Sequence, residues 1–141
     1  MDAKLPEPGI PEHWNWPNFT PAELRCKHTG IFAMQPAFLD RLQELRTELG
    51  FPFVITSGYR APTHPVEAAK KWPGAHAYGR AVDIATASAV RSLRIVERAR
   101  AFGFTGIGVS MPVGQLGHRF IHLDDMQPDE FHAVRPNFWS Y

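Results

Sequence analysis

The feature that most constrains the fold is an aspartate set inside an apolar strand. In the segment RAVDIA, strand alternation places Val82 and Ile84 on one face and Asp83, between two alanines, on the other. An ionised carboxylate in such surroundings is costly unless a cation pairs with it. We therefore expect the larger residues to face the core and Asp83 to face a partner, which is either a metal ion or an arginine, Arg60 or Arg80.

A second segment, HRFIHLDD, carries polar side chains at the same period. Alternation puts His118, His122 and Asp124 on one face together with Phe120, and leaves Ile121 and Leu123 on the other. His76 precedes Asp83 by seven residues. The set His76, Asp83 and His122 offers two imidazoles and a carboxylate, which suit a zinc site with three protein ligands and one open position. Spacing alone leaves open that these histidines are only hydrogen-bonded and that the aspartate pairs with arginine.

Capping signals and apolar spacing predict four helices. In FTPAEL, Thr20 is the expected N-cap, with Glu23 completing a capping box. A longer helix over 36–49 ends at Gly50 and should bury five residues: Phe38, Leu39, Leu42, Leu45 and Leu49. A short helix is expected over 65–71. The fourth is capped by Ser88 and runs to about Phe102, with four residues predicted to face inward: Val90, Leu93, Val96 and Ala99.

The strand pattern predicts an α+β domain with a small antiparallel sheet flanked by helices. Strands are expected over 53–56, 80–85, 106–109 and 119–124. The length of 141 residues fits one domain, which we place at 19–141. Residues 1–18 are rich in proline and tryptophan, and we expect them to form an irregular arm.

Charge and cysteine content argue against several kinds of partner and site. The formal net charge of +1 gives no electrostatic case for nucleic acid or an anionic membrane as partner. The single cysteine, Cys26, forms no intrachain disulfide, and with His28 alone it makes no closed metal site. No apolar run approaches the roughly 20 residues of a membrane span. The opening MDAKLPEPGIPEHW lacks an apolar signal core, so we expect synthesis in the cytoplasm without a signal peptide.

Three motifs in this order, SGYRAPTH, HAYGRAVDI and FIHLD, resemble the M15 zinc peptidases, the D-alanyl-D-alanine carboxypeptidase and endopeptidase family. The resemblance is closest to its short single-domain branch in bacteria and phages, and NFTPAELRC and the closing tryptophan extend it over most of the chain. The Hedgehog signalling domain has a similar spacing of zinc-binding histidine and aspartate. The resemblance implies a Hedgehog-like fold and a Zn²⁺ ion bound by His76, Asp83 and His122. It also implies that Arg60 binds a substrate carbonyl or carboxylate oxygen.

The general base is not settled by this resemblance. Asp124, on the same face as His122, is our first choice and His118 the second, while Asp124 could instead hold a ligand in place. Tyr59 and His64 are candidate substrate-binding residues, each weighed against a packing or loop role. Gly74 stands where the family usually has serine, which puts the orientation of His76 in question.

The expected function is that of a monomeric zinc peptidase that hydrolyses a peptide bond in the stem peptide of bacterial peptidoglycan. It would act on the cell wall, for instance as a phage lysin or a virion component. The alternative is a non-catalytic, zinc-stabilised module that binds cell wall or protein. A third interpretation, without metal, is an anion-binding domain that uses Arg60 and Arg80.

Overall fold

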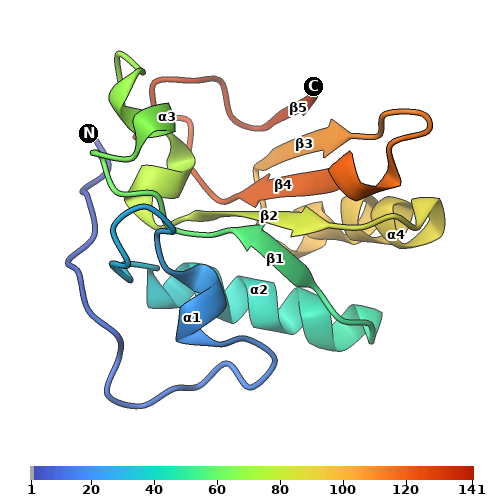
Figure 1. Ribbon diagram of the computed structural model, residues 1–141, viewed down its shortest axis with the longest axis horizontal. Helices are drawn as coiled ribbons and strands as arrows, with labels where there is room; N and C mark the ends of the chain where they lie inside the picture. Colours follow the sequence, from blue (N-terminus) through green and yellow to red (C-terminus); the bar gives the residue numbers. More distant parts are fainter. Residues whose placement is uncertain (1) are drawn as a thin grey trace.

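Five short strands pair into one sheet in the computed structural model, which describes residues 2–141 (Figure 1). The strands are β1 (Val54–Ser57), β2 (Ala81–Ala85), β3 (Gly106–Ser110), β4 (Phe120–Asp124) and β5 (Asn137–Ser140). Their order is β1-β2-β4-β3-β5. All neighbours are antiparallel except β3 and β5, which run parallel. The predicted fold class is therefore confirmed, but β5 was not predicted.

The helices lie close to their predicted positions. They are α1 (Pro21–Leu24), α2 (Pro36–Leu49), α3 (Pro65–Ala68) and α4 (Ala89–Ala99), with 3₁₀ turns η1 (Ala75–Tyr78), η2 (Arg100–Phe102) and η3 (Leu116–His118). Thr20 accepts the backbone N–H of Glu23 as predicted. Gly50 ends α2 with a φ of 74°, a left-handed conformation that glycine adopts without strain. The helix predicted over 65–71 is shorter, ending at Ala68.

One face of the sheet packs against α2 and α4 and forms the core. The sheet contributes Val82, Ile84, Ile121 and Leu123, and α2 contributes the five apolar residues predicted to be buried. The opposite face of β2 and β4 carries Asp83 and His122 and is not covered by these helices. The alternation read from the two segments thus separates a packed face from a polar one.

The inward face predicted for α4 is wrong in part. Val90 and Leu93 are 70% and 57% exposed, while Ser92, Ile95 and Ala99 are buried. Both stripes have helical spacing, so periodicity alone cannot choose between them. The buried stripe contains Ser92, whose hydroxyl donates to the carbonyl of Ser88 at 2.9 Å. Because serine is polar, a pattern of apolar residues does not predict that this position is buried.

Residues 2–18 contain no helix or strand, but the chain before α1 packs on the main core. The Trp16 ring is 3% exposed, and its Nε1 donates to Asp40 on α2 at 2.8 Å. Nearer the N-terminus, the N–H of Ala3 donates to the carbonyl of Glu130 at 3.0 Å. This N-terminal segment therefore contacts α2 through Trp16 and the segment between β4 and β5 through Ala3. Within residues 2–141, no helix has the length and apolar character needed to cross a membrane.

Candidate metal centre

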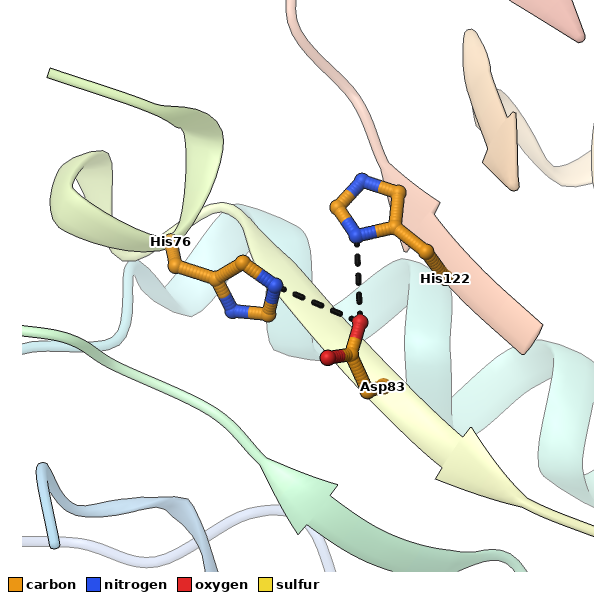
Figure 2. A group of neighbouring side chains, drawn as sticks. All are labelled: His76, Asp83 and His122. Atoms are coloured by element: carbon orange, nitrogen blue, oxygen red, sulfur yellow. Dashed lines mark hydrogen bonds and ion pairs between the residues drawn. The ribbon is translucent and has the colours of Figure 1, made fainter. Parts of the chain in front are cut away.

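The sheet register brings two of the three predicted ligands face to face. Asp83 on β2 is the cross-strand partner of His122 on β4, so both side chains project from the same face. The third, His76, lies in η1, which precedes β2. Gly79 ends that turn with a φ of 66° and redirects the chain into the strand. Figure 2 shows the two rings approaching the Asp83 carboxylate from different sides.

The donor atoms of these residues converge on one point. Nε2 of His76 lies 3.3 Å from Oδ1 of Asp83, and Nδ1 of His122 lies 3.1 Å from the same oxygen (Figure 2). One ligand atom from each residue lies within 4.8 Å of the others. Two ligands about 2.0–2.1 Å from a tetrahedral zinc ion are separated by about 3.3 Å. The predicted ligand set is therefore brought together at a spacing that fits such an ion.

Hydrogen bonds on the far side of each ring set the tautomer that a metal requires. Nδ1 of His76 lies 2.7 Å from the carbonyl oxygen of Gly58, and Nε2 of His122 lies 2.7 Å from Oδ2 of Asp124. Both partners are acceptors, so we assign the ring protons to these two nitrogens. The lone pairs of the other nitrogens then face Asp83. Such outward partners commonly orient metal-binding histidines.

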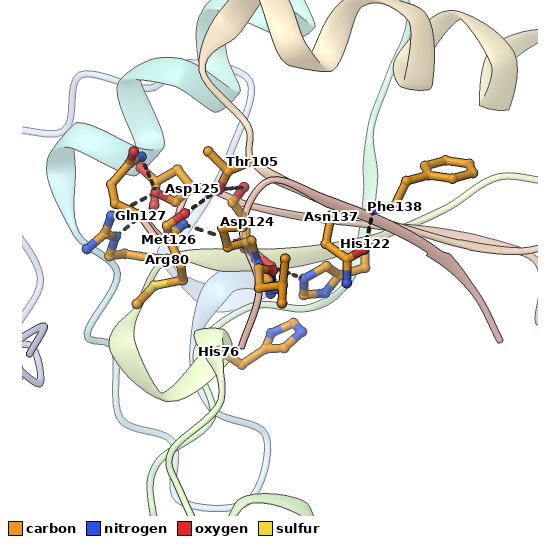
Figure 3. A network of polar contacts seen from close by, with 12 residues as sticks. His76, Arg80, Thr105, His122, Asp124, Asp125, Met126, Gln127, Asn137 and Phe138 are labelled. Atoms are coloured by element: carbon orange, nitrogen blue, oxygen red, sulfur yellow. Dashed lines mark hydrogen bonds and ion pairs between the residues drawn. The ribbon is translucent and has the colours of Figure 1, made fainter. Parts of the chain in front are cut away.

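Asp124 is buried next to His122 (Figure 3), and its carboxylate is bound by Arg135. Arg135 donates from Nε to Oδ1 at 2.9 Å and from Nη2 to Oδ2 at 2.8 Å. Burial alone would raise the pKa of Asp124, but the hydrogen bonds from His122 and Arg135 lower it to about 2. The expected orientation of Asp124 toward an open pocket is not observed. The geometry agrees instead with the alternative interpretation, in which Asp124 holds a ligand.

Arg60 contacts the second oxygen of Asp83. Its Nη2 lies 3.3 Å from Oδ2 of Asp83, and its Nε donates to Oγ of Ser57 at 3.1 Å. The two partners proposed for Asp83 would thus use different oxygens, because Arg60 contacts Oδ2 and the two histidines face Oδ1. Arg80 instead pairs with Asp125 and Glu130, at 2.7 Å each.

The three donors face a pocket of about 430 Å³. Arg60, Lys70, His132, Arg135 and Trp139 line it together with the ligand set. An open pocket beside three protein ligands leaves room for a substrate at the remaining coordination position of a metal.

Three other predicted site residues lie outside this pocket. His118 is exposed in η3, before β4 begins, so its expected place on the inward face of that strand is wrong. A 3₁₀ turn breaks the period-2 alternation at this point. Tyr59 and His64 line a neighbouring cavity instead. The ring of Tyr59 also belongs to the core, and His64 caps α3 by accepting the N–H of Val66 at 3.1 Å.

Sequence reasoning missed the wall supplied by β5 and the loop before it. The Trp139 ring lies 5.2 Å from the His122 ring, and the Arg135 guanidinium lies 5.1 Å from the Trp139 ring, measured between centres. Gly106 and Gly108 make this possible. A Cβ at 108 would lie 2.6 Å from Nε1 of Trp139, and one at 106 would overlap the Asp124 carboxylate. The sequence did contain one indication of this wall: two glycines alternate in the GIG segment of β3, and glycine inside a strand often marks a site where another group approaches closely.

Glu67 explains the glycine found where a serine was expected. Its side chain is 1% exposed, and its oxygens accept from the Gly74 N–H at 2.9 Å and from Lys70 Nζ at 2.7 Å. A Cβ at 74 would lie 3.0 Å from Glu67 Oε1 and 2.6 Å from Lys70 Nζ. A larger residue at 74 would therefore displace the end of Lys70 and press on the buried Glu67 carboxylate, and the His76 ring is oriented from Gly58 instead.

The fold and the three-donor site define a candidate metallohydrolase domain. The sequence matches the family model described as Peptidase M15 over residues 17–124, and the chain belongs to this peptidase family. That span includes Arg60 and all three predicted ligands, and it ends before Arg135 and Trp139. A search of curated protein sequences finds no match.

Proposed function

We propose that this protein is a zinc-dependent peptidase that hydrolyses a peptide bond in the stem peptide of bacterial cell-wall peptidoglycan. The observation that carries the proposal is the convergence of Nε2 of His76, Oδ1 of Asp83 and Nδ1 of His122 beside an open pocket. The donor set, its spacing and the fixed tautomers fit zinc. Membership of the M15 family supports peptide hydrolysis, and the resemblance of the motifs supports the cell-wall substrate.

The chain supplies substrate orientation and charge stabilisation through Arg60. Zinc at a three-ligand site supplies Lewis-acid polarisation of a carbonyl and activation of water. The Arg60 side chain is 20% exposed and contacts both Asp83 and Ser57, which fix its direction at the edge of the pocket. A guanidinium placed there can bind the carbonyl oxygen of the substrate and stabilise the negative charge that develops on it.

His132 is the pocket group that we assign as proton acceptor. It lines the pocket but belongs to neither the ligand set nor the cations. The His132 side chain is exposed at the edge of the pocket, and local desolvation, followed by the charges of Arg135 and Lys70, lowers its pKa, which favours the neutral ring at pH 7. Asp124 has both oxygens engaged by Arg135, and His118 lies outside the pocket. Neither of the bases favoured from the sequence is as well placed to accept a proton from a substrate or from water.

The test is digestion of purified cell walls by the zinc-loaded protein, with product masses read by mass spectrometry. We expect one class of peptide bond to be cut, and Arg60→Ala to lower turnover by about 10²-fold, the scale for one oxyanion donor. Arg60→Lys should restore only part, because an ammonium lacks the fork geometry. Zinc content should stay unchanged in both variants. Tight binding of cell walls with no released peptide would instead identify a non-catalytic binding module.

A further inference from the structure

A second cavity opens beside the metal pocket, next to β1. It has a volume of about 210 Å³, and its lining includes Arg25, Lys27, Tyr59 and His64. Arg60 lines both this cavity and the metal pocket. Val66 also lines both, so the two cavities are adjacent, and an extended ligand bound in one can reach the other.

The positive charge of the second cavity is not neutralised by the protein. Arg25 and Lys27 are exposed, and among residues 2–141 neither has a carboxylate within ion-pair distance. Other arginines of the chain do have such partners, as in the pairs Arg80–Asp125, Arg98–Glu48 and Arg135–Asp124. The lining of the cavity contains no acidic residue. Two cations beside Arg60 thus remain available to a ligand.

The two carboxylates that contact Arg60, those of Asp83 and Glu67, are already engaged. Asp83 is bound by the two histidines and Arg60, and Glu67 is bound by Lys70 and the Gly74 N–H. His64 adds a neutral donor: because its Nδ1 accepts the Val66 N–H, the neutral ring carries its proton on Nε2. Among the described residues, neither these carboxylates nor the lining of the cavity supplies a negative charge to Arg25 and Lys27.

We propose that this second cavity is a subsite for a free carboxylate on the peptide substrate, bound by Arg25 and Lys27. The inference rests on the proposed function, because the anion must belong to the molecule that also reaches the metal pocket. In an unmodified peptide the only ionised anions are carboxylates, and a cavity of about 210 Å³ has room for one acidic side chain. The subsite selects substrates with a free carboxylate near the cleaved bond.

The experiment compares three forms of one peptide, L-Ala-γ-D-Glu-L-Lys-D-Ala-D-Ala. The first carries both free carboxylates, the second has the glutamate α-carboxylate converted to a carboxamide, and the third has an amidated C-terminus. Zinc-loaded wild type, the double variant Arg25→Gln with Lys27→Gln, and the control Lys71→Gln are assayed for kcat/KM. Lys71 lies over the Trp72 ring at 5.8 Å and lines neither cavity.

In wild type and in Lys71→Gln, one of the amides should lower kcat/KM by about 10-fold, mostly through KM. This corresponds to about 1.4 kcal/mol, the low end for a hydrogen bond to a charged group, as expected for exposed cations screened by salt. In the double variant the same amide should cost nothing, because the coupling between substrate and subsite is gone. If all three peptides are cut equally well by wild type, or if the loss persists in the double variant, the subsite is refuted while the peptidase function stands.

A binding measurement keeps this inference separable from the proposed function. If the zinc-loaded protein cuts none of the peptides, the dissociation constants of the same three peptides are measured by calorimetry. About 10-fold tighter binding of the free carboxylate by wild type, abolished in the double variant, supports the subsite even though peptidase activity has failed. Equal binding of the three forms, or no binding at all, overturns it.

Discussion

The ring of His122 donates from Nε2 to the carboxylate of Asp124, two residues further along β4, at 2.7 Å. Alternation puts both side chains on the same face of the strand, yet only one of them reaches the pocket. The other is buried and bound at both oxygens by Arg135. A single strand thus supplies a candidate ligand and the group that fixes its orientation.

Asp124→Asn should act on metal affinity and stability. An amide can still accept from His122, but it leaves the buried Arg135 guanidinium without its ion pair. We expect zinc affinity to fall by about 10- to 100-fold and the free energy of unfolding to fall by about 3–5 kcal/mol. Chelator competition and urea unfolding measure these two effects. Lost turnover with unchanged zinc affinity and stability would return the role of general base to Asp124.

Removal of a predicted ligand should remove the metal. Zinc-loaded wild type should hold about one ion per chain by elemental analysis, and His76→Ala or Asp83→Ala should hold almost none after dialysis against a weak chelator. His28→Ala is the matched control, since this histidine is exposed and outside the cluster. Full zinc content in either ligand variant would show that the ion binds elsewhere.

His132 and His118 separate two assignments of the base. His132→Ala should lower kcat by about 10²–10⁴-fold, the range for general base catalysis, while His118→Ala should leave it unchanged. A base works when deprotonated, and burial followed by the neighbouring cations lowers the pKa of His132. Wild-type turnover should therefore hold at pH 7 and fall as the pH drops through this lowered pKa, and this acidic limb should disappear in His132→Ala. The reverse ranking of the two variants would contradict our assignment.

Glu67 should make the free energy of unfolding fall at acidic pH. Burial raises its pKa, but the hydrogen bonds from Lys70 and the Gly74 N–H outweigh burial and lower it below the ordinary value of 4.5. Since the folded state holds the proton less tightly than the unfolded state, the stabilisation is complete above pH 4.5 and is lost as the pH falls through the lowered value. Urea unfolding across this range should show a smaller acid loss in Glu67→Gln than in wild type. The exposed Glu44→Gln on α2 is the control, and equal pH dependence in all three proteins would exclude this role.

The sequence predicted the parts of the fold that follow local periodicity. The five buried residues of α2, the alternation in β2 and β4 and the capping by Thr20 depend on neighbours in the chain, and each was confirmed. The strand aspartate indicated a cationic partner, and the motif resemblance predicted His76, Asp83 and His122 as ligands; the structure brings these three residues together. The buried face of α4 was predicted wrongly in part because it contains Ser92, a polar residue that is buried with a local hydrogen-bond partner.

The wall of the site could not be predicted in the same way. Arg135 and Trp139 reach the metal pocket only because β5 pairs in parallel with β3, a contact between segments some 30 residues apart with no local pattern. Asp124 looked accessible because alternation gives the face of a side chain but not its depth. Its depth depends on the arginine that arrives from the loop before β5.

The two glycines of β3 have a consequence for attempts to stabilise this protein. Glycine in a strand interior lowers stability, so a library that optimises the sheet would favour valine or threonine at 106 and 108. Those replacements would raise strand propensity and at the same time push Asp124 and Trp139 away from His122. Thermostability and function are therefore in opposition on this strand. Engineering for heat resistance is better directed to Val90 and Leu93, whose exposed side chains lie on α4, away from the pocket.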